Sequence, residues 1–454
     1  MGVPIPRGGA GAAERDEAGR QLMPPAAPWQ CMSVSDDLLD LRRDLHRHPE
    51  PAWREFYTTA RLVDELEKRP LDELHVGPEV LAADRRGVPD DDELDEWARR
   101  AVEAGAREDV VERLAGGYTG LVAVLKRGEG PTVGLRVDID ALPIAEADAD
   151  DHEPASMGFR SENEGYMHAC GHDAHATVGV GVLDAVAESD FSGTLKVLFQ
   201  PSEEIVSGGE PMAEGGHLDD VAYLLALHVG LDHPTGEVVA GVDGFLAQQH
   251  FRAEFSGASS HAGGHPERGR NAVQAMATAI GNLYSIPRHD GGATRVNAGL
   301  VGGGTASNIV PDEAFIEGEV RGETTELREY MDAHARRILR SAAGMHDCEV
   351  DVEYGGRAPG GESDDELAGV VAEVAGETTG VDSVLDSDDL GGSEDATYLM
   401  QHVQDRGGLA AYVCVGTDHP GGHHSPTFDV DEETIRIAVD VFGGTIERLG
   451  REAM

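Results

Sequence analysis

The stretch "GTLKVLFQPSEE", residues 193–204, is a short apolar run that stops at a proline and is followed by two glutamates. Short runs of this kind, rich in large or β-branched apolar residues and bounded by Gly or Pro, are typical of buried strands. Three further segments share the pattern and precede Asp or His residues: "PTVGLRV" (131–137), "VAYLLAL" (221–227) and "AAYVCVG" (410–416). The sequence therefore predicts four buried strands, each with polar side chains just beyond it.

Helical patterns separate the predicted strands. Apolar residues recur at helical spacing over residues 174–188 and from Glu432 to the end of the chain. A further helix is expected over Asp36–Arg47, with Ser35 as its capping residue. Strands that alternate with helices form mostly parallel sheets, and such sheets bind ligands just beyond the carboxyl ends of their strands. We therefore predict an α/β fold in which the four sets of polar side chains share one site.

Residues 249–360 show a different pattern. Alternating apolar and polar residues predict strands in "HFRAEFSG", "TRVNAGLVGGG", "AFIEGEVRG" and "CEVDVEY", with amphipathic helices after the first and the third. This βαββαβ order predicts a ferredoxin-like α+β domain, inserted into the first domain, with its helices on one face of a small sheet. The first domain then comprises residues 33–248 and 361–454, with a charged helical insertion near 77–116. Residues 1–32, rich in Gly, Ala and Pro and without the apolar core of a secretion signal, are expected to be a disordered leader or to precede the true start of the chain.

The composition indicates a particular environment. The 454 residues carry a formal net charge of −49 and only three lysines. A surface this acidic repels nucleic acid phosphates and anionic membranes, and its self-repulsion destabilises the fold unless salt screens the charges. We therefore expect a halophilic protein from a salty cytoplasm that binds neither nucleic acid nor membranes. The four widely spaced cysteines, without a CxxC pair, fit a reducing compartment, and no apolar run approaches the ~18 residues of a membrane span.

A second short stretch, "HACGHDAHATVGVG" (168–181), concentrates residues that bind metals. Cys170 and His172 share a face if the segment is extended, and Asp173 is placed to cap the helix that follows. The thiol would then lie near the positive end of that helix, which lowers its pKa and favours the thiolate. Thiolate, imidazole and carboxylate are ligands for zinc-like ions. The alternative is a small buried cysteine beside surface histidines.

The Glu203–Glu204 pair can divide two roles at the end of its predicted strand. One carboxylate can bind a metal while the other takes a proton from water. In an acidic protein, however, two adjacent glutamates are also common on an ordinary surface. His228 alone is typical of a capping or core histidine, whereas His424 lies in a Gly-rich loop that lets the backbone approach a ligand closely.

Eight motifs follow one another along the chain: "RVDIDALPI", "HACGHDAH", "LFQPSEE", "LHVG", "SHAG", "SNIVP", "GGSEDAT" and "GHHSPTFD". In this order they resemble the co-catalytic metal amidohydrolases, a family that includes hippurate hydrolases, N-acyl-amino-acid deacylases, auxin-conjugate hydrolases and p-aminobenzoyl-glutamate hydrolases. The resemblance covers about residues 36–449. Within the family, the insertion "HVGPEVLAADRRGVPDD" is most similar to the A subunit of p-aminobenzoyl-glutamate hydrolase.

The resemblance implies a site with two divalent metal ions. The residues that match its ligands are Cys170, as the bridge, His172, Glu204, His228 and His424. Glu203 matches the general base, and Asp140 matches the aspartate that orients a ligand, with Asp138 as its neighbour. The doublet His423–His424 leaves the last ligand open. The remaining histidines of these motifs and loops match no functional position, and we expect them to be structural or solvent-facing: His168, His175, His265 and His419.

The resemblance also implies a role for the inserted domain, as a lid and dimerisation domain. His261 matches a histidine that reaches the active site of a partner protomer. Asn308 and Arg321 match residues that bind the carboxylate of the substrate. A homodimer is therefore expected, and a related B subunit is a further candidate partner.

These observations predict an enzyme that hydrolyses the amide bond of an N-acyl amino acid, with p-aminobenzoyl-glutamate as one candidate substrate. Cys170 favours zinc as the metal, whereas the resemblance to p-aminobenzoyl-glutamate hydrolase implies manganese. One alternative is a carboxypeptidase or dipeptidase on the same scaffold. A second is a non-catalytic metal-binding partner subunit, against which the intact Glu203 argues, because a metal store needs no base.

Overall fold

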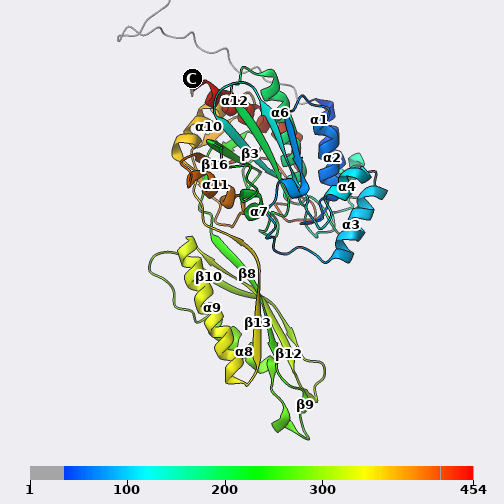
Figure 1. The fold of residues 1–454 in the computed structure, drawn as a ribbon, viewed down its shortest axis with the longest axis vertical. Helices are drawn as coiled ribbons and strands as arrows, with labels where there is room; N and C mark the ends of the chain where they lie inside the picture. The colour runs from blue at the N-terminus through cyan, green and yellow to red at the C-terminus, as the bar shows by residue number, and fades with distance from the viewer. Residues whose placement is uncertain (1–34, 420, 453–454) are drawn as a thin grey trace, which may run out of the picture.

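The computed structural model describes residues 35–419 and 421–452, and the predicted leader, residues 1–32, lies outside them. The larger sheet has eight strands in the order β1-β2-β4-β3-β5-β16-β6-β14 (Figure 1). The four strands expected from the sequence are neighbours in it and run parallel: β4 (Thr194–Gln200), β3 (Thr132–Asp138), β5 (Tyr223–Val229) and β16 (Leu409–Val415). The predicted strands and the predicted, mostly parallel sheet are therefore confirmed.

The outer strands make the sheet mixed. They are β1 (Glu73–Val76), β2 (Leu121–Lys126), β6 (Glu237–Val239) and β14 (Ser383–Leu385). β2 pairs antiparallel with β1 and β4, while β6 pairs antiparallel with β16 and parallel with β14. Each of the four parallel strands thus has a paired neighbour on both sides, which holds the carboxyl ends in place.

Helices cover both faces of this sheet. In β5, Leu225 and Leu227 pack into one apolar cluster, and Leu224 and Ala226 pack into another on the opposite face. The first cluster includes residues of α1 (Asp36–Arg47), α2 (Phe56–Leu66), α6 (His172–Glu188), α10 (Asp365–Glu377) and α12 (Glu432–Glu452). The second includes residues of α7 (Gly209–Ala213) and α11 (Ala396–Gln404). Because both faces are buried, the central strands are almost continuously apolar, which is why the sequence alone reveals them.

The predicted helices of this part are present. The helix over residues 36–47 is confirmed as α1, although the side chain of Ser35 makes no capping hydrogen bond. α6 begins at His172, slightly before the predicted start, and α12 begins at Glu432 as predicted. The insertion near 77–116 is helical, as expected, with η1 (Gly77–Glu79), α3 (Asp91–Glu103) and α4 (Glu108–Arg113), and the short α5 (Glu153–Met157) follows β3.

A second sheet forms a separate lobe that extends away from the first sheet (Figure 1). Its elements in chain order are β8 (Ala247–Ser256), α8 (Ala272–Leu283), β10 (Thr294–Gly303), β12 (Glu313–Gly322), α9 (Thr325–Met345) and β13 (Glu349–Ala358). The strands pair antiparallel in the order β10-β12-β8-β13, and α8 and α9 share an apolar cluster with one face of the sheet. This is the predicted βαββαβ order, so the ferredoxin-like fold is confirmed.

Two short strand pairs lie outside these sheets. β9 (Ser260–His261) pairs with β11 (Ile309–Val310), next to η2 (Pro266–Arg268), and β7 (Val242–Asp243) pairs with β15 (Asp388–Asp389). β9 lies at the end of the second lobe that is remote from the larger sheet (Figure 1). In the described part of the chain, every helix is too short or too polar to span a membrane.

Candidate active site

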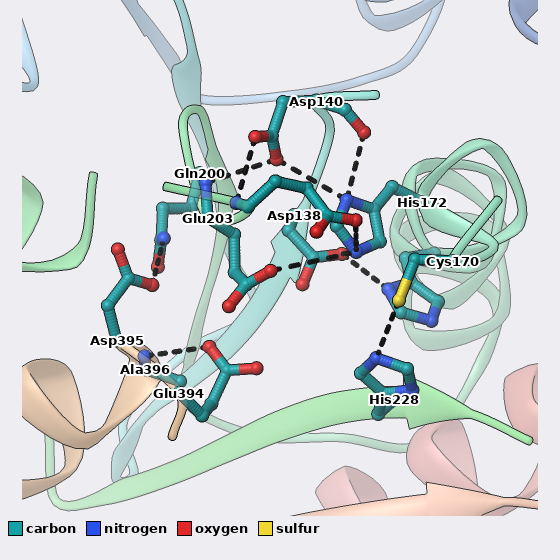
Figure 2. Close-up of polar contacts among 12 residues, drawn as sticks. Asp138, Asp140, Cys170, His172, Gln200, Glu203, His228, Glu394, Asp395 and Ala396 are labelled. Carbon is teal, nitrogen blue, oxygen red and sulfur yellow. Dashed lines mark hydrogen bonds and ion pairs between the residues drawn. The ribbon is translucent and has the colours of Figure 1, made fainter. Parts of the chain in front are cut away.

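Polar side chains meet at one edge of the larger sheet (Figure 2). They are Asp138 at the end of β3, Glu203 and Glu204 after β4, His228 near the end of β5, His423 and His424 after β16, and Cys170 and His172 at the start of α6. Because the carboxyl ends of parallel strands lie at the same edge, residues far apart in the sequence come together there. The structure thus shows the convergent site that the strand pattern predicts.

The five residues expected to bind metal lie close together. Cys170 Sγ is 3.5 Å from His228 Nε2, and His172 Nε2 is 3.8 Å from Glu204 Oε1. Donor atoms of Cys170, Glu204 and His424 lie within 4.8 Å of one another. The described residues therefore contain groups of donors with the spacing of a metal site.

The two histidine rings are held so that one nitrogen of each faces the cluster. His172 Nδ1 lies 2.9 Å from the carbonyl oxygen of Asp140, and His228 Nδ1 lies 2.7 Å from that of Val229. Because a carbonyl oxygen only accepts, these contacts make Nδ1 the donor, so the neutral ring carries its lone pair on Nε2, the arrangement of a ligand histidine. Among the described residues, His172 Nε2 and Glu204 Oε1 are buried and have no hydrogen-bond partner. Because each such unpaired atom costs ~1–3 kcal/mol, this donor set fits a divalent cation.

The pKa values of the cluster reflect the burial of several acids together. Burial raises the pKa of Glu204 to about 8, and burial with the nearby Glu394 and Glu204 raises the pKa of Glu203 well above its usual range. Burial, reinforced by Glu204, also raises the pKa of the Cys170 thiol. The prediction that the start of the helix lowers this pKa is therefore wrong for the protein alone, because burial and the charge of Glu204 raise it. A bound cation acts in the opposite direction, since it favours carboxylate and thiolate.

Asp140 connects both acids to His172. Its carboxylate oxygens accept hydrogen bonds from the backbone N–H groups of Glu203 (3.1 Å) and Glu204 (3.0 Å). Its backbone carbonyl accepts the bond from the His172 ring. Asp140 thus links the backbone of both glutamates to the ring of His172.

A buried ion cluster beside the site was missed by the sequence analysis. Arg136 in β3 has no exposed surface and pairs with Asp138 at 2.8 Å and with Glu394 at 3.0 Å. The Tyr412 hydroxyl also donates to Glu394, at 2.8 Å. Oxygens of Asp138, Glu203 and Glu394 lie within 4.8 Å of one another (Figure 2). An arginine inside an apolar strand was the available signal, because a buried cation requires carboxylates nearby.

Asp173 does not cap α6, so that prediction is wrong. The N-cap residue is Gly171, with φ +84°, and Asp173 lies in the first turn, where its carboxylate pairs with Arg42 and His46, each at 2.9 Å. These charged partners bind a carboxylate more strongly than a backbone N–H does. A Cβ at Gly171 would lie 2.7 Å from Val229 Cγ2, so this left-handed position requires glycine.

The four histidines without an expected role occupy different environments. His168 and His175 are buried, whereas His265 is exposed and His419 is half-buried. His175 contacts Asp138 through Nδ1 and accepts a hydrogen bond from a backbone N–H at Nε2. A ring nitrogen of His175 also lies within 4.8 Å of donor atoms of Asp138 and His172.

Both members of the histidine doublet approach the cluster. His424 Nε2 is 3.5 Å from Glu204 Oε2. A ring nitrogen of His423 forms a group with donor atoms of Cys170 and His228, all within 4.8 Å. The geometry therefore keeps both histidines as candidate ligands.

The three residues expected to act on substrate lie in two different places. His261 and Asn308 are exposed at the remote end of the second lobe, where the carbonyl of Asn308 accepts a hydrogen bond from the backbone N–H next to His261. The structure does not bring either residue to the cluster within one chain. Arg321, at the other end of β12, pairs with Glu319 at 2.9 Å. It also reaches Ser393, at 3.4 Å, in the part of the chain built on the larger sheet, which is called the first lobe below.

Thiol, imidazole and carboxylate donors beside a buried glutamate, at the carboxyl edge of a parallel sheet, define a metal-dependent hydrolase as the class of protein. Residues 134–448 match the family described as Peptidase family M20/M25/M40. The chain belongs to this family. The predicted family and the predicted hydrolase class are confirmed.

Two curated relatives and two solved structures show how close the likeness is. An indole-3-acetyl-aspartic acid hydrolase from Enterobacter agglomerans is 39% identical, and the alignment covers 94% of this chain and 96% of the relative. The A subunit of p-aminobenzoyl-glutamate hydrolase from Escherichia coli is 37% identical, and the alignment covers 91% of this chain and 96% of the relative. The structure of an aminobenzoyl-glutamate utilization protein from Klebsiella pneumoniae has a TM-score of 0.77 at 34% identity, covering 90% of this chain and 95% of its own. A Bacillus subtilis protein described as a dinuclear metal binding peptidase has a TM-score of 0.65 at 25% identity, with 92% and 98% covered.

Proposed function

We propose that the protein hydrolyses the amide bond of N-acyl amino acids in which the amine is an acidic amino acid. The observation that carries this proposal is the position of Glu203, a buried carboxylate beside a group of unpaired donor atoms that fits a cation. The names of the two curated relatives support the substrate class, since one acts on an aspartate conjugate and the other on a glutamate conjugate. p-Aminobenzoyl-glutamate is accordingly the first candidate substrate.

We propose two divalent ions as cofactors, with zinc or manganese as the candidates. Cys170, His172, Glu204, His228 and His424 would hold them. His424 is preferred to His423 because His423 Nε2 already lies 3.1 Å from the carbonyl oxygen of Val229. When bound, such ions polarise the amide carbonyl and make water a better nucleophile at neutral pH.

The residues of the chain supply the proton transfers and the binding contacts. Glu203 accepts a proton from the attacking water and returns it to the nitrogen of the leaving amine, a role that typically contributes ~10²–10⁴-fold to the rate. His261 donates a hydrogen bond to the oxyanion that develops on the carbonyl oxygen. Asn308 and Arg321 bind the substrate carboxylate, for which the planar guanidinium offers two parallel hydrogen bonds.

The proposal includes a homodimer in a salty cytoplasm. Because His261 and Asn308 lie far from the cluster of their own chain, they would serve the site of a partner protomer. A related B subunit is the alternative partner, as the subunit designation of the Escherichia coli relative suggests. The net charge of −49 would be screened by concentrated salt.

A hydrolysis screen tests this function. Purified protein, loaded with zinc or with manganese and kept at high salt, would be incubated with p-aminobenzoyl-glutamate, indole-3-acetyl-aspartate, hippurate, N-acetyl amino acids and dipeptides. We expect release of the amine from the aspartate and glutamate conjugates, and loss of this release after chelation. Preference for dipeptides would instead identify a peptidase on this scaffold, and inactivity on every compound would favour a non-catalytic partner subunit.

A further inference from the structure

The turn that carries the two glutamates is held by its backbone. The N–H groups of three successive residues all donate to buried carboxylates: Ser202 to Glu55 at 2.8 Å, Glu203 to Asp140 at 3.1 Å and Glu204 to Asp140 at 3.0 Å. Ser202 has φ +60°, a left-handed conformation that costs energy for a residue other than glycine. The turn therefore depends on outside contacts to keep this shape.

Glu55 links this turn to the start of α2. The residue has no exposed surface, and its second carboxylate oxygen accepts a hydrogen bond from the hydroxyl of the buried Thr119 at 2.6 Å. Thr119 and the following Gly120 lie directly against the turn, since a Cβ at Gly120 would be 2.7 Å from Pro201 Cδ. Both oxygens of Glu55 are thus occupied, and the direction of the carboxylate is set.

We propose that Glu55 is a positioning residue that holds Glu203 and Glu204 in place through the backbone of Ser202. This inference rests on the proposed function, because it assigns to Glu55 the placement of the base and of a metal ligand. None of the eight motifs contains Glu55, and its sequence context predicts no role for it. A misplacement of about 1 Å at a reacting group can cost ~10²-fold in rate, so a residue that never touches substrate can still control turnover.

Glu50 provides a matched comparison within the same region. Its carboxylate is also buried and also accepts two hydrogen bonds, from the backbone N–H groups of Tyr57 and Thr58 at 2.8 and 2.9 Å. Those partners belong to the first turn of α2 itself. The groups that donate to the Glu55 carboxylate, the Thr119 hydroxyl and the Ser202 N–H, belong to other segments. Loss of the Glu50 carboxylate should therefore weaken the fold without moving the turn.

The test compares Glu55→Met, Glu55→Gln, Thr119→Val and Glu50→Met, with metal content and steady-state kinetics measured for each folded variant. Glu55→Met, which removes the acceptor, should lower kcat about 10²-fold with KM within about threefold of the original value. Glu55→Gln should retain most of kcat, because its amide oxygen can still accept from Ser202. Thr119→Val should lower kcat by several-fold, because the Glu55 carboxylate loses the hydrogen bond that fixes its direction. Glu50→Met should leave kcat within about twofold of the original value while lowering the melting temperature.

Hydrogen exchange gives a second measurement that does not need activity. The peptide spanning residues 201–206 should lose protection from exchange in Glu55→Met and Thr119→Val but not in Glu50→Met. Each variant is measured at the same number of degrees below its own melting temperature. Equal kcat losses in Glu55→Met and Glu50→Met, or unchanged protection of this peptide, would overturn the proposal. If Glu55→Met does not fold, the comparison of Thr119→Val with Glu50→Met decides by the same criteria. Inactivity of the unmodified protein would instead contradict the proposed function, and the exchange measurement would still decide whether Glu55 holds the turn.

Discussion

The two sheets differ in how deeply their charged side chains are buried. In the eight-stranded sheet, Arg136 and Asp138 are fully buried and paired with each other. In the four-stranded sheet, charged residues lie on the face away from α8 and α9 and stay partly exposed, as in the Arg252–Glu317 pair, whose side chains are 37% and 43% exposed. Exposed pairs contribute ~0–1 kcal/mol, whereas breaking a buried pair costs ~3–5 kcal/mol. The first sheet is thus built to fix side chains in place, and the second to present them to solvent.

This difference separates two kinds of functional residue. The candidate metal ligands and Glu203 all come from the first lobe, where strand ends and buried carboxylates set their positions. His261 and Asn308 come from the exposed end of the second lobe. A rigid site for the chemistry and a separate surface for contacting the substrate would follow from this division, and the variants below test it.

The largest effect on activity is expected for Glu203→Gln, a substitution in the first lobe. The amide cannot accept the proton of the attacking water, so kcat should fall by ~10²–10⁴-fold. Metal content should be retained, because Glu203 is not among the proposed ligands. Steady-state kinetics and metal analysis check both expectations, with the exposed Glu349→Gln as the control. Normal turnover in Glu203→Gln would show that another group is the base.

The next effect concerns the exposed end of the second lobe, in His261→Ala. Loss of an oxyanion donor should lower kcat by ~10²-fold. If the histidine serves a partner's site, mixing the His261→Ala and Glu203→Gln proteins under conditions that exchange protomers should restore activity. Each mixed dimer then has one intact site, so random pairing should recover about a quarter of the original rate.

Recovery in this mixing experiment distinguishes the two arrangements. A mixture that stays inactive, although mass spectrometry shows that protomers exchange, would place His261 at the site of its own chain. The two lobes would then have to approach each other in some other conformation.

A smaller effect is expected where the second lobe meets the first, in Arg321→Lys. Lysine keeps the charge but loses the two parallel hydrogen bonds to a carboxylate, so KM should rise about tenfold with kcat little changed. The rise should disappear for a substrate whose carboxylate is amidated. Arg252→Lys, on the same sheet but paired with the half-buried Glu317, is the control and should behave like the original protein.

The smallest effect is expected from salt, which acts on both lobes. Lowering the salt from 1 M to 0.1 M lengthens the Debye screening distance from ~3 to ~10 Å. The melting temperature and kcat/KM for an anionic substrate should then fall, the latter by several-fold. An uncharged osmolyte at matched osmolarity should not replace the salt. Constant stability and activity across the titration would contradict the halophilic interpretation.

Local sequence patterns predicted much of the fold and many members of the candidate site. The central strands were recognisable because they are apolar on both faces, and the βαββαβ lobe because its strands alternate and its helices are amphipathic. The cap at Asp173 was wrong because Arg42 and His46 come from a helix more than a hundred residues away. The prediction of a lowered pKa for Cys170 was wrong because tertiary packing buries the thiol and places Glu204 beside it, and both raise the pKa. Glu55 was missed because its partners, Thr119 and Ser202, are distant in the sequence, and the pair of Arg136 with Glu394 was missed for the same reason.

By itself, the amino-acid sequence determined which segments become strands and helices and which residue types stand at the strand ends, because these follow from residue spacing and from burial along one segment. Only the tertiary structure decided which of those side chains meet. It joined Glu203 and Glu204 to Asp140, joined the neighbouring Ser202 to Glu55, surrounded Arg136 with carboxylates, and left His261 in solvent. The physical reason is that hydrogen bonds and ion pairs act over a few ångströms in space, whatever the separation of their partners along the chain.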